Sequence, residues 1–357
     1  MSGAARLRVR SLTVRHAGAA GDAVRGVSFE LGAGEHAALM GASGSGKSTL
    51  LLALCGLIAA RSGQVEVDGA DVTAAPPHRR GASLVPQEAP LYPHLSVVEN
   101  VAMPLRAAGV PRAAALRRAV EMAGRLGLGP LLARRADALS GGERRRAALG
   151  RALVLEPAVL LLDEPFAALD PPLREAMRSL VREAAGAAGC ACLHATHDGA
   201  EAMRLGDRVL VLDAGRLVDD GPPMRVWSQP RGVRAALLVG PLPMNVLPGT
   251  PPRGVRAEHL RVRPAQAGAS AVEPGWRRWD ARVRRVEPQG GHAVVIAAAE
   301  AARTAAGAGG AEPFELRALV PADAAPAPGD AVWMEAPDAQ IHAFPAPDAH
   351  ADSGDAA

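Results

Sequence analysis

The segment Gly41–Thr49 constrains the fold of this chain more than any other, because it reads Gly-Ala-Ser-Gly-Ser-Gly-Lys-Ser-Thr. This matches G-x-x-x-x-G-K-[ST], in which the backbone N–H groups of a glycine-rich loop surround phosphates at the start of a helix. The chain has 40 Lys plus Arg residues, and Lys47 is the one lysine among them. An ammonium is a compact point charge, whereas a planar guanidinium is too wide to share such a loop with a phosphate. We therefore predict a phosphate-binding loop rather than an ordinary Gly/Ser-rich turn.

The sequence on both sides of this loop agrees with that prediction. The apolar run His36–Met40 predicts a short buried strand, and residues 48–58 predict a helix whose N-terminus faces the anion. Lys47 is expected to reach the β- and γ-phosphates, and Ser48 to offer its hydroxyl to Mg²⁺. The loop residues expected to bind nucleotide are Gly41, Ala42, Ser43, Gly44, Ser45, Gly46, Lys47, Ser48 and Thr49.

A second chemical feature is the apolar run Ala158–Leu162, which is followed at once by Asp163 and Glu164. Such a run is typical of a central strand buried on both faces, and it would deliver the two carboxylates at the edge of the sheet where α/β ligands bind. We expect Asp163 to hold Mg²⁺ through water and Glu164 to orient or deprotonate the water that attacks the γ-phosphorus. The alternative is a strand that ends in a solvated acidic pair.

A second potential anion site lies between these two motifs. Ser140 is a good helix N-cap, and Gly141 and Gly142 leave the first amides of the following helix bare. The chain thus has two phosphate-binding helix starts, which need not meet within one molecule.

The length of 357 residues favours two domains. Apolar strands alternate with helical stretches up to about Pro230, which predicts an α/β layer on a mostly parallel sheet. Five prolines then mark a linker, and short alternating runs such as Ala281–Val286 predict a small β domain with a loose Ala/Gly-rich loop over Glu300–Ala311. We divide the chain into a nucleotide-binding domain over 1–232, a linker over 233–250, a β domain over 251–345 and a disordered tail over 346–357.

Charge and cysteine content narrow the function classes. A net charge of +3, with scattered Arg-Arg pairs, gives no footprint for nucleic acid. Cys55, Cys190 and Cys192 give neither a disulfide framework nor a metal spacing, and the Cys190-Ala-Cys192 pattern places two small side chains on one face of a buried strand. The N-terminus lacks the apolar core of a signal peptide, and no window has the roughly 18 apolar residues of a membrane helix. We expect a protein of a reducing cytosol that is soluble, or peripheral to a membrane through a partner.

Taken in this order, the motifs resemble those of the ATP-binding subunits of ABC transporters, over residues 5–232. Further matches are Gln87 in Val-Pro-Gln (the Q-loop), Asp170 in Ala-Leu-Asp (the D-loop) and His197 in Ala-Thr-His-Asp (the switch histidine). The resemblance implies a P-loop NTPase fold with a helical subdomain, which binds ATP and Mg²⁺. It implies catalytic roles for Glu164, His197 and Gln87, and Mg²⁺ ligation by Ser48, Gln87 and Asp163. It also implies that Ser140, Gly141 and Gly142 cap the γ-phosphate of ATP bound by the opposite subunit, and that Asp170 belongs to the nucleotide site.

Three positions depart from the family pattern. Glu143 replaces the usual Gln, Ala167 replaces the usual Ser of the D-loop, and His16 stands at about the position of the adenine-stacking aromatic. A histidine ring stacks less well than Tyr or Trp, so we predict weak base discrimination and substitution of GTP for ATP.

The C-terminal part resembles the TOBE (OB-like) domain of importer ATPases of the maltose, polyamine, sulfate and iron type. The segments that carry this resemblance are Gly254–Leu260, Val283–Ile296, Asp330–Trp333 and Ile341–Phe344, with Ala257 where the family usually has Pro. The alternative is another kind of small β barrel.

We therefore predict the ATP-hydrolysing subunit of a binding-protein-dependent importer, peripheral on the cytoplasmic face of the cell membrane. Its expected partners are a second copy of itself or a homologous ATPase, two transmembrane permease subunits and, indirectly, an extracytoplasmic solute-binding protein; no nucleic acid is expected. The alternatives are a non-transport ABC ATPase acting on nucleic acid or ribosomes and an exporter ATPase. The transported solute is not encoded in these motifs.

Overall fold

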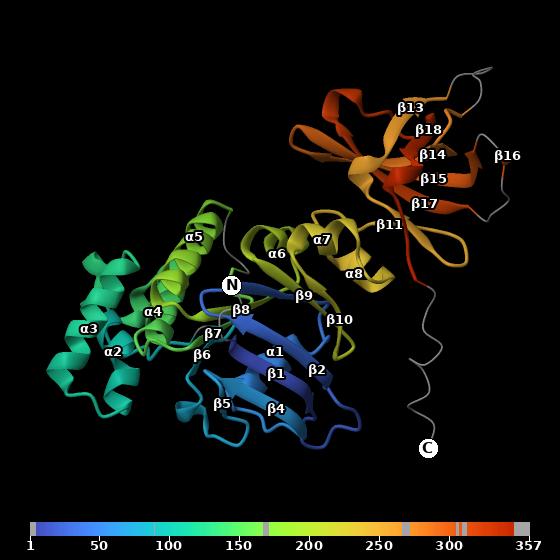
Figure 1. Ribbon diagram of the computed structural model, residues 1–357. Coiled ribbons are helices and arrows are strands. Elements are labelled where there is room, and N and C mark those ends of the chain that lie inside the picture. The colour runs from blue at the N-terminus through green and yellow to red at the C-terminus, as the bar shows by residue number, and fades with distance from the viewer. Residues whose placement is uncertain are drawn as a thin grey trace. The chain divides into compact units, whose positions relative to one another are not determined.

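The computed structural model describes residues 5–88, 90–166, 171–265, 272–304, 307–308 and 313–345. The chain divides into two compact units, Met1–Pro223 and Met224–Ala357 (Figure 1). The division lies before the segment 233–250 that was predicted to be a linker. The predicted tail 346–357 lies outside the described residues.

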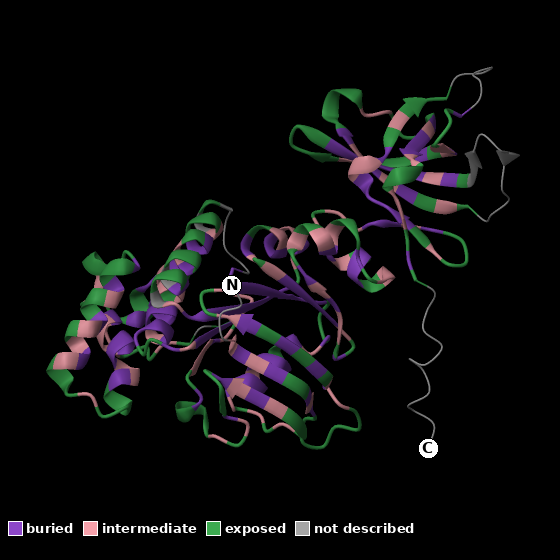
Figure 2. Ribbon diagram, in the orientation of Figure 1, coloured by how far each residue is buried: buried purple, intermediate pink, exposed green. Residues whose placement is uncertain are grey.

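The centre of the first unit is a mostly parallel sheet, as the alternation of strands and helices predicted. Its strand order within the described residues is β10-β9-β3-β8-β7-β6, and all neighbours are parallel except β10 and β9. Figure 2 shows the central strands β3, β7 and β8 buried along most of their length, which explains their largely apolar sequences. The strands are β3 (His36–Met40), β6 (Ala82–Val85), β7 (Val159–Asp163), β8 (Ala191–Thr196), β9 (Arg208–Asp213) and β10 (Arg216–Gly221).

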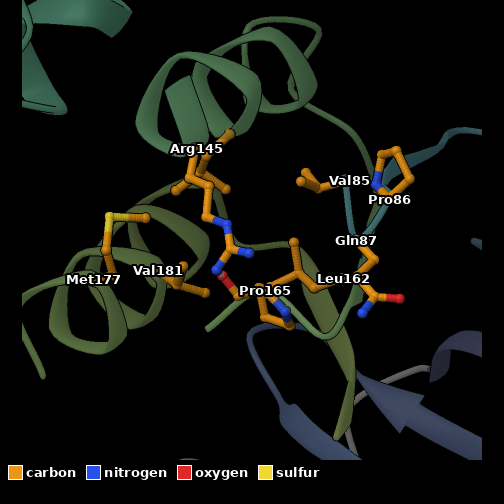
Figure 3. Close-up of a pocket in the computed structure, with 9 residues that line it drawn as sticks. Val85, Pro86, Gln87, Arg145, Leu162, Pro165, Met177 and Val181 are labelled. Atoms are coloured by element: carbon orange, nitrogen blue, oxygen red, sulfur yellow. Dashed lines mark hydrogen bonds between the residues drawn. The ribbon is translucent and has the colours of Figure 1, made fainter. Parts of the chain in front are cut away.

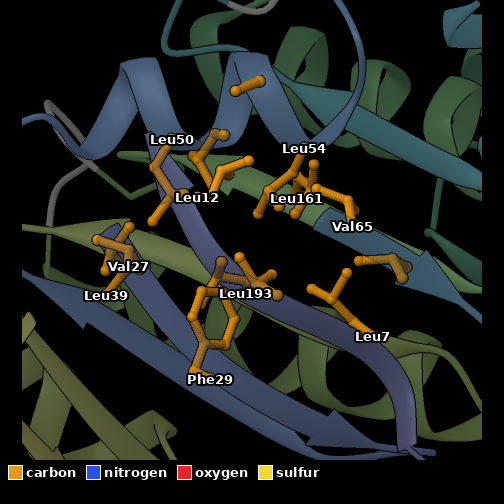
Figure 4. Packing of buried hydrophobic residues seen from close by; sticks show 14 of the residues in the cluster. Leu7, Leu12, Val27, Phe29, Leu39, Leu50, Leu54, Val65, Leu161 and Leu193 are labelled. Atoms are coloured by element: carbon orange, nitrogen blue, oxygen red, sulfur yellow. The ribbon is translucent and has the colours of Figure 1, made fainter. Parts of the chain in front are cut away.

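A separate antiparallel sheet, which the sequence did not distinguish, covers helix α1 (Lys47–Leu54) from the other side. Its order is β2-β1-β4-β5, formed by β1 (Ala5–Val14), β2 (Val24–Gly32), β4 (Ser62–Val67) and β5 (Ala70–Asp71). Leu50 and Leu54 of α1 pack with Leu12 of β1 and with Leu161 and Leu193 of the parallel sheet (Figure 4). Helix α1 is therefore held in one core between two sheets, and the loop that precedes it has a rigid base.

Helix α1 ends at Leu54, so the prediction of a helix through residue 58 is wrong. The buried guanidinium of Arg80 donates to the carbonyls of Ala53 and Leu54 and satisfies the end of the helix. Gly56 has a φ of +84°, and a Cβ there would lie 2.4 Å from Nε of Arg80. Arg80 thus leaves no room for a side chain at position 56, where the chain turns away with a positive φ.

A group of helices lies beside the sheet edge that carries β6 (Figure 1). It comprises α2 (Val97–Ala107), α3 (Arg112–Arg125) and α4 (Gly141–Leu153), and α5 (Pro171–Ala188), which follows β7, packs against α4. Helix α6 (Gly199–Leu205) follows β8 and lies against β3. Cys190 and Cys192 pack in the same cluster as Leu149 of α4, on one face of β8, as the alternating Cys-Ala-Cys pattern predicted. The three cysteines are free and buried.

The second unit is built of antiparallel strands. Its described sheets have the orders β11-β12-β19 and β13-β18-β14-β15-β16, and β17 also pairs with β15. The strands are β11 (Asn245–Leu247), β12 (Arg253–Val255), β13 (Arg261–Pro264), β14 (Trp276–Gln289), β15 (His292–Thr304), β16 (Gly307–Ala308), β17 (Phe314–Pro321), β18 (Ala331–Pro337) and β19 (Ile341–Ala343). The short 3-10 turns of both units are Pro77–Arg79, Gly129–Leu131, Ala136–Ala138, Ala257–His259, Ala322–Ala324 and Asp338–Gln340.

The prediction of a loose loop over Glu300–Ala311 is wrong at its start, because β15 continues to Thr304. Ala302 pairs with Trp279 of β14, and Arg303 and Thr304 also pair with β16. The long partner strand supplies backbone hydrogen bonds that local composition does not reveal. Residues 305–306 and 309–312 lie outside the described part of the chain.

The predicted linker contains regular structure that a buried arginine stabilises. Helix α8 (Val233–Leu238) and strand β11 lie within the predicted linker, and helix α7 (Pro223–Ser228) lies just before it. Arg256 is 1% exposed and donates to the carbonyls of Trp227, Ala236, Val239 and Leu242. A guanidinium at the C-terminal ends of two helices meets their exposed carbonyls and the negative ends of their dipoles.

Two buried histidines cross-link the centre of the parallel sheet. His36 on β3 and His194 on β8 are 3% and 0% exposed, and Nε2 of His36 lies 2.9 Å from Nδ1 of His194 in a hydrogen bond. Burial lowers the pKa of His36 to about 4 and also lowers the pKa of His194. The charge of Asp207 raises the pKa of His36, and that of Arg182 lowers it. Arg178 lowers the pKa of His194, and Oε1 of Glu201 lies 3.8 Å from Nε2 of His194.

We expect this pair to make the first unit labile in acid. At a pH above 6.5 His36 is neutral in both the folded and the unfolded chain, so its contribution to stability is fully present. Between pH 6.5 and about 4 mainly the unfolded chain takes up the proton, so stability falls as the pH falls, by roughly 3 kcal/mol for His36. The raised pKa of Glu201, caused by burial, acts in the opposite sense.

The measurement is the free energy of unfolding in urea at about pH 7 and at about pH 5. The His36→Gln variant should lose less stability between these conditions than the wild type, whereas replacement of the exposed His78 by Gln should leave the difference unchanged. An equal pH dependence in the wild type and His36→Gln would contradict the assignment.

Along the described part of the chain, no helix combines the length and the apolar character needed to cross a bilayer.

Candidate nucleotide-hydrolysis site

The order of the parallel strands brings the predicted motifs to one edge of the sheet. Strands β3, β8, β7 and β6 are consecutive neighbours and parallel, so their carboxyl ends lie side by side. Gly41 follows β3, His197 follows β8, Glu164 follows β7, and Gln87 lies two residues after β6. Residues separated by more than a hundred positions in the sequence thus form one site.

The loop between β3 and α1 has the tight geometry that its glycines predicted. A Cβ at Gly41 would lie 2.4 Å from both the carbonyl oxygen of Leu212 and Oγ of Ser45, and a Cβ at Gly46 would lie 2.4 Å from the carbonyl oxygen of Ala23. Gly46 is the N-cap of α1 with a φ of +104°. Among the described residues, the buried hydroxyl of Ser45 has no hydrogen-bond partner. The loop is therefore held in a tight turn, and the unpaired hydroxyl of Ser45 is a group that suits a phosphate.

Lys47 lies across this loop. Its Nζ donates to the carbonyls of Gly41, at 2.8 Å, and Ala42, at 3.0 Å, and the residue is 6% exposed. Burial lowers the pKa of Lys47, while the nearby carboxylates of Glu164 and Asp163 raise it. An ammonium has three N–H donors, so a donor remains for a phosphate oxygen after these two bonds.

Glu164 is the centre of a side-chain cluster at the sheet edge. Its Oε1 lies 2.9 Å from Nδ1 of His197, and its Oε2 accepts from Nε2 of Gln87 at 3.4 Å. The side chain of Glu164 is 20% exposed and that of His197 is 63% exposed. Glu164 has a φ of +45°, and its backbone N–H donates to the carbonyl of Ala195 on β8 at 3.0 Å. A non-glycine residue in this conformation is held there by its surroundings, a common feature of functional sites.

The donor set at this edge fits a Mg²⁺ ion. Asp163 ends β7 as a half-buried residue, Ser48 is exposed at the start of α1, and Gln87 offers an amide oxygen. Carboxylate, hydroxyl and amide oxygens are hard ligands, and Mg²⁺ is usually held by one or two carboxylates together with phosphate oxygens and water. The described residues contain no group of three or more His, Cys, Asp or Glu that could hold a metal on its own.

The start of α4 has the predicted cap. Ser140 is the N-cap, its Oγ accepts from the backbone N–H of Glu143 at 3.3 Å, and the Glu143 carboxylate accepts from the Ser140 N–H at 2.7 Å. These bonds, with nearby Arg134 and Arg146, hold the pKa of Glu143 below its usual value. Ser140 and Gly141 are exposed and Gly142 is buried. The carboxylate that replaces the family's Gln thus turns onto the start of its own helix, where it accepts from the N–H of Ser140 while Gly141 stays exposed.

His16 lies beside the phosphate-binding helix, near where the resemblance placed an adenine-stacking ring. Its Nε2 forms a hydrogen bond of 2.9 Å with Oγ1 of Thr49, and the residue is exposed. The acceptance of GTP stays a prediction, which Michaelis constants for GTP and ATP would test; a strong preference for ATP would contradict it. Asp170, together with Ala167 and Ala168 of the predicted D-loop, lies outside the described residues.

Two groups that border the site could not be predicted from the sequence. Arg145 of α4 donates to the carbonyl of Pro165, the residue after Glu164, and the carbonyl of Ala195 receives the Glu164 N–H. Neither has a local sequence signal, because arginine on a helix is usually a surface residue and a backbone carbonyl has no side-chain identity.

Known proteins similar to this chain agree with the geometry. The sequence model of the ABC transporter family matches residues 24–167. An sn-glycerol-3-phosphate import ATP-binding protein of Ralstonia nicotianae is 41% identical over 271 residues, which cover 76% of this chain and 73% of the relative. A protein of the same description from Rhodopseudomonas palustris is 36% identical over 347 residues, covering 91% of this chain and 93% of the relative. With its phosphate-binding loop, its Asp-Glu pair and the exposed signature at α4 in their expected places, the chain belongs to the ABC transporter family, as an ATP-binding subunit of the importer type.

Proposed function

We propose that this chain hydrolyses Mg·ATP at the carboxyl edge of its parallel sheet, with Glu164 as the general base. The observation that carries this proposal is the cluster in which Glu164 accepts from Gln87 and contacts His197, at the end of the strand that also carries Asp163. A carboxylate held by two side chains from neighbouring strands has a fixed direction, which is what a base that activates one water molecule requires.

Each residue then has a defined part in the reaction. The loop amides and Lys47 hold the β- and γ-phosphates. Mg²⁺ is held by Ser48, Asp163 and Gln87, and the ring of His16 stacks on the nucleotide base. Mg²⁺, when bound, neutralises phosphate charge and positions the polyphosphate. As the attacking water bonds to the γ-phosphorus, Glu164 takes its proton and the bond to the ADP oxygen breaks. His197 holds the carboxylate of Glu164 in place. It can also form a hydrogen bond with the γ-phosphate, which leaves as inorganic phosphate.

We further propose that two subunits share each ATP. Ser140, Gly141 and Gly142 form a second helix start suited to an anion, and the exposure of Ser140 and Gly141 supports contact with another molecule. In such a dimer the γ-phosphate joins the two chains, so ATP favours the closed form and hydrolysis favours reopening. Asp170 is proposed to lie at the same interface.

The permease contact is proposed to be the segment from Gln87 to Leu95. A pocket is lined there by Pro90, Leu91, Tyr92, Met103, Pro104 and Arg151, and Tyr92 is 40% exposed. Because this segment begins at Gln87, a permease that moves it also moves the amide that donates to Glu164. By reciprocity, ATP binding then changes the affinity for the permease. The subunit would then be peripheral on the cytoplasmic face of the membrane.

The solute is selected by the partners, and the names of the relatives make sn-glycerol-3-phosphate the solute that we propose. The antiparallel C-terminal unit is proposed to be a TOBE domain, in keeping with its sequence pattern.

The test is affinity purification of the tagged chain from a detergent-solubilised membrane fraction, followed by an ATPase assay and an uptake assay with labelled sn-glycerol-3-phosphate. We expect two integral membrane permease subunits to copurify, and uptake to stop with a Lys47→Ala chain. Recovery of ribosomes or DNA in place of permeases would contradict the transport assignment, and uptake of a different solute would contradict the choice of solute alone.

A further inference from the structure

Arg145 makes a direct link between the helical group and the loop that carries Glu164. It lies on α4, one turn after Ser140, and its Nη1 donates to the carbonyl oxygen of Pro165 at 3.0 Å. Figure 3 shows its guanidinium extending from α4 toward Pro165. Pro165 directly follows Glu164, so the bond holds the Pro165–Phe166 peptide, one residue beyond the proposed base.

The surroundings of Arg145 make this bond stronger than one on the surface. The pocket that the side chain enters is bordered by Val85, Leu149, Leu162, Met177 and Val181 (Figure 3). Burial among these apolar groups lowers the pKa of Arg145. A hydrogen bond from a charged donor to a carbonyl is stronger than a neutral one, and a low local dielectric increases its effect. Gln87, which donates to Glu164, borders the same pocket as Arg145.

The backbone at Glu164 is fixed from two sides. On one side its N–H donates to Ala195 of β8, and on the other the carbonyl of the next residue accepts from Arg145 of α4. Between these bonds Glu164 keeps the left-handed conformation with a φ of +45°. Loss of either bond would free a strained peptide to relax and would turn the carboxylate away from its position.

We propose that Arg145 is a positioning residue for Glu164, and that it couples the two nucleotide sites of the dimer. This inference rests on the proposed function, because the same helix α4 that presents Ser140 and Gly141 to the partner's ATP holds the Pro165 carbonyl beside the base of its own site. When α4 is drawn onto the partner's nucleotide, the Pro165 peptide moves with it, so capture of one ATP adjusts the base that acts on the other. Arg145 itself contacts no reacting atom.

The competing explanation is that Arg145 contributes only to packing, through its aliphatic stem in the apolar pocket. Arg145→Met keeps the length and apolar character of the stem but removes the donor, whereas Arg145→Lys keeps a cation with one donor able to reach the carbonyl. Arg125→Met serves as the control, because Arg125 is an exposed residue of α3 in an ion pair with Glu121.

The experiment measures kcat, KM and the Hill coefficient for ATP in the full chain assembled with its permeases, together with the dissociation constant of a fluorescent ATP analogue and the melting temperature. For Arg145→Met we expect kcat to fall roughly 10-fold to 100-fold, as loss of one charged hydrogen bond implies, with KM and ATP affinity nearly unchanged and the Hill coefficient reduced. Arg145→Lys should recover part of kcat, and Arg125→Met should match the wild type.

Two outcomes would overturn the inference. One is an Arg145→Met chain with the kcat and Hill coefficient of the wild type. The other is an equal loss of kcat, ATP affinity and melting temperature in both the Met and Lys variants, since this indicates packing alone. If Arg145→Met does not fold, the Lys variant decides the matter through its kcat relative to its ATP affinity. Failure of the proposed function is distinguishable, because the wild-type assembly would then release no phosphate from ATP.

Discussion

The Glu164→Gln variant is expected to bind ATP and to lose turnover by about 10²–10⁴-fold, the contribution of a general base. Glutamine has the same shape as glutamate, so its amide oxygen can accept from Gln87 and its NH₂ group can donate to Nδ1 of His197 in place of the present contacts. What is lost is the ability to take a proton. Lys47 and the phosphate-binding loop are unchanged, and one negative charge near the phosphates is removed, so ATP should stay bound and hold the dimer closed.

The measurements are steady-state phosphate release and the molecular mass of the protein with and without ATP. Glu121→Gln is the matched control, because it makes the same chemical change at an exposed position of α3. Hydrolysis by Glu164→Gln at the wild-type rate would show that another group takes the proton.

The second large effect is expected in dimers that combine two different lesions. Lys47→Ala removes the ammonium from the phosphate-binding loop, and Gly141→Asp places a carboxylate at the start of α4, where it repels a γ-phosphate. The structure favours this choice, because a Cβ at Gly141 would meet no atom within 4 Å among the described residues, its chain neighbours and own helix backbone aside, so there is room for a side chain at this position. Both lesions are placed in the Glu164→Gln background, and the ATP retained per dimer is counted.

If two chains complete each site, a dimer with Lys47→Ala in one chain and Gly141→Asp in the other keeps one intact composite site and retains about one ATP. A dimer with both lesions in the same chain has a defect in each site and retains none. If each chain instead forms a whole site alone, the two results are exchanged. Differently tagged copies purified in two steps give each dimer in defined composition.

Much of the site could be predicted because its residues are encoded as short motifs next to the elements that present them. The glycines before Lys47 specify the turn, the apolar run before Asp163 specifies a buried strand, and Ser140 three positions before Glu143 specifies a capped helix. Each of these patterns acts within about ten residues, and the structure forms all three as the sequence indicates. Catalytic roles remain predictions, because they concern a reaction and a second chain.

Sequence alone thus determined the local elements and the identity of the reactive groups, since backbone conformation and hydrophobic periodicity are short-range properties. Tertiary structure alone decided what those groups contact. Arg80 ends α1, Arg145 reaches Pro165, and His36 bonds His194, although these pairs have no common local pattern. Such contacts depend on which strands become neighbours and on how side chains fill a close-packed interior, and packing of this kind is a property of the whole chain rather than of any segment.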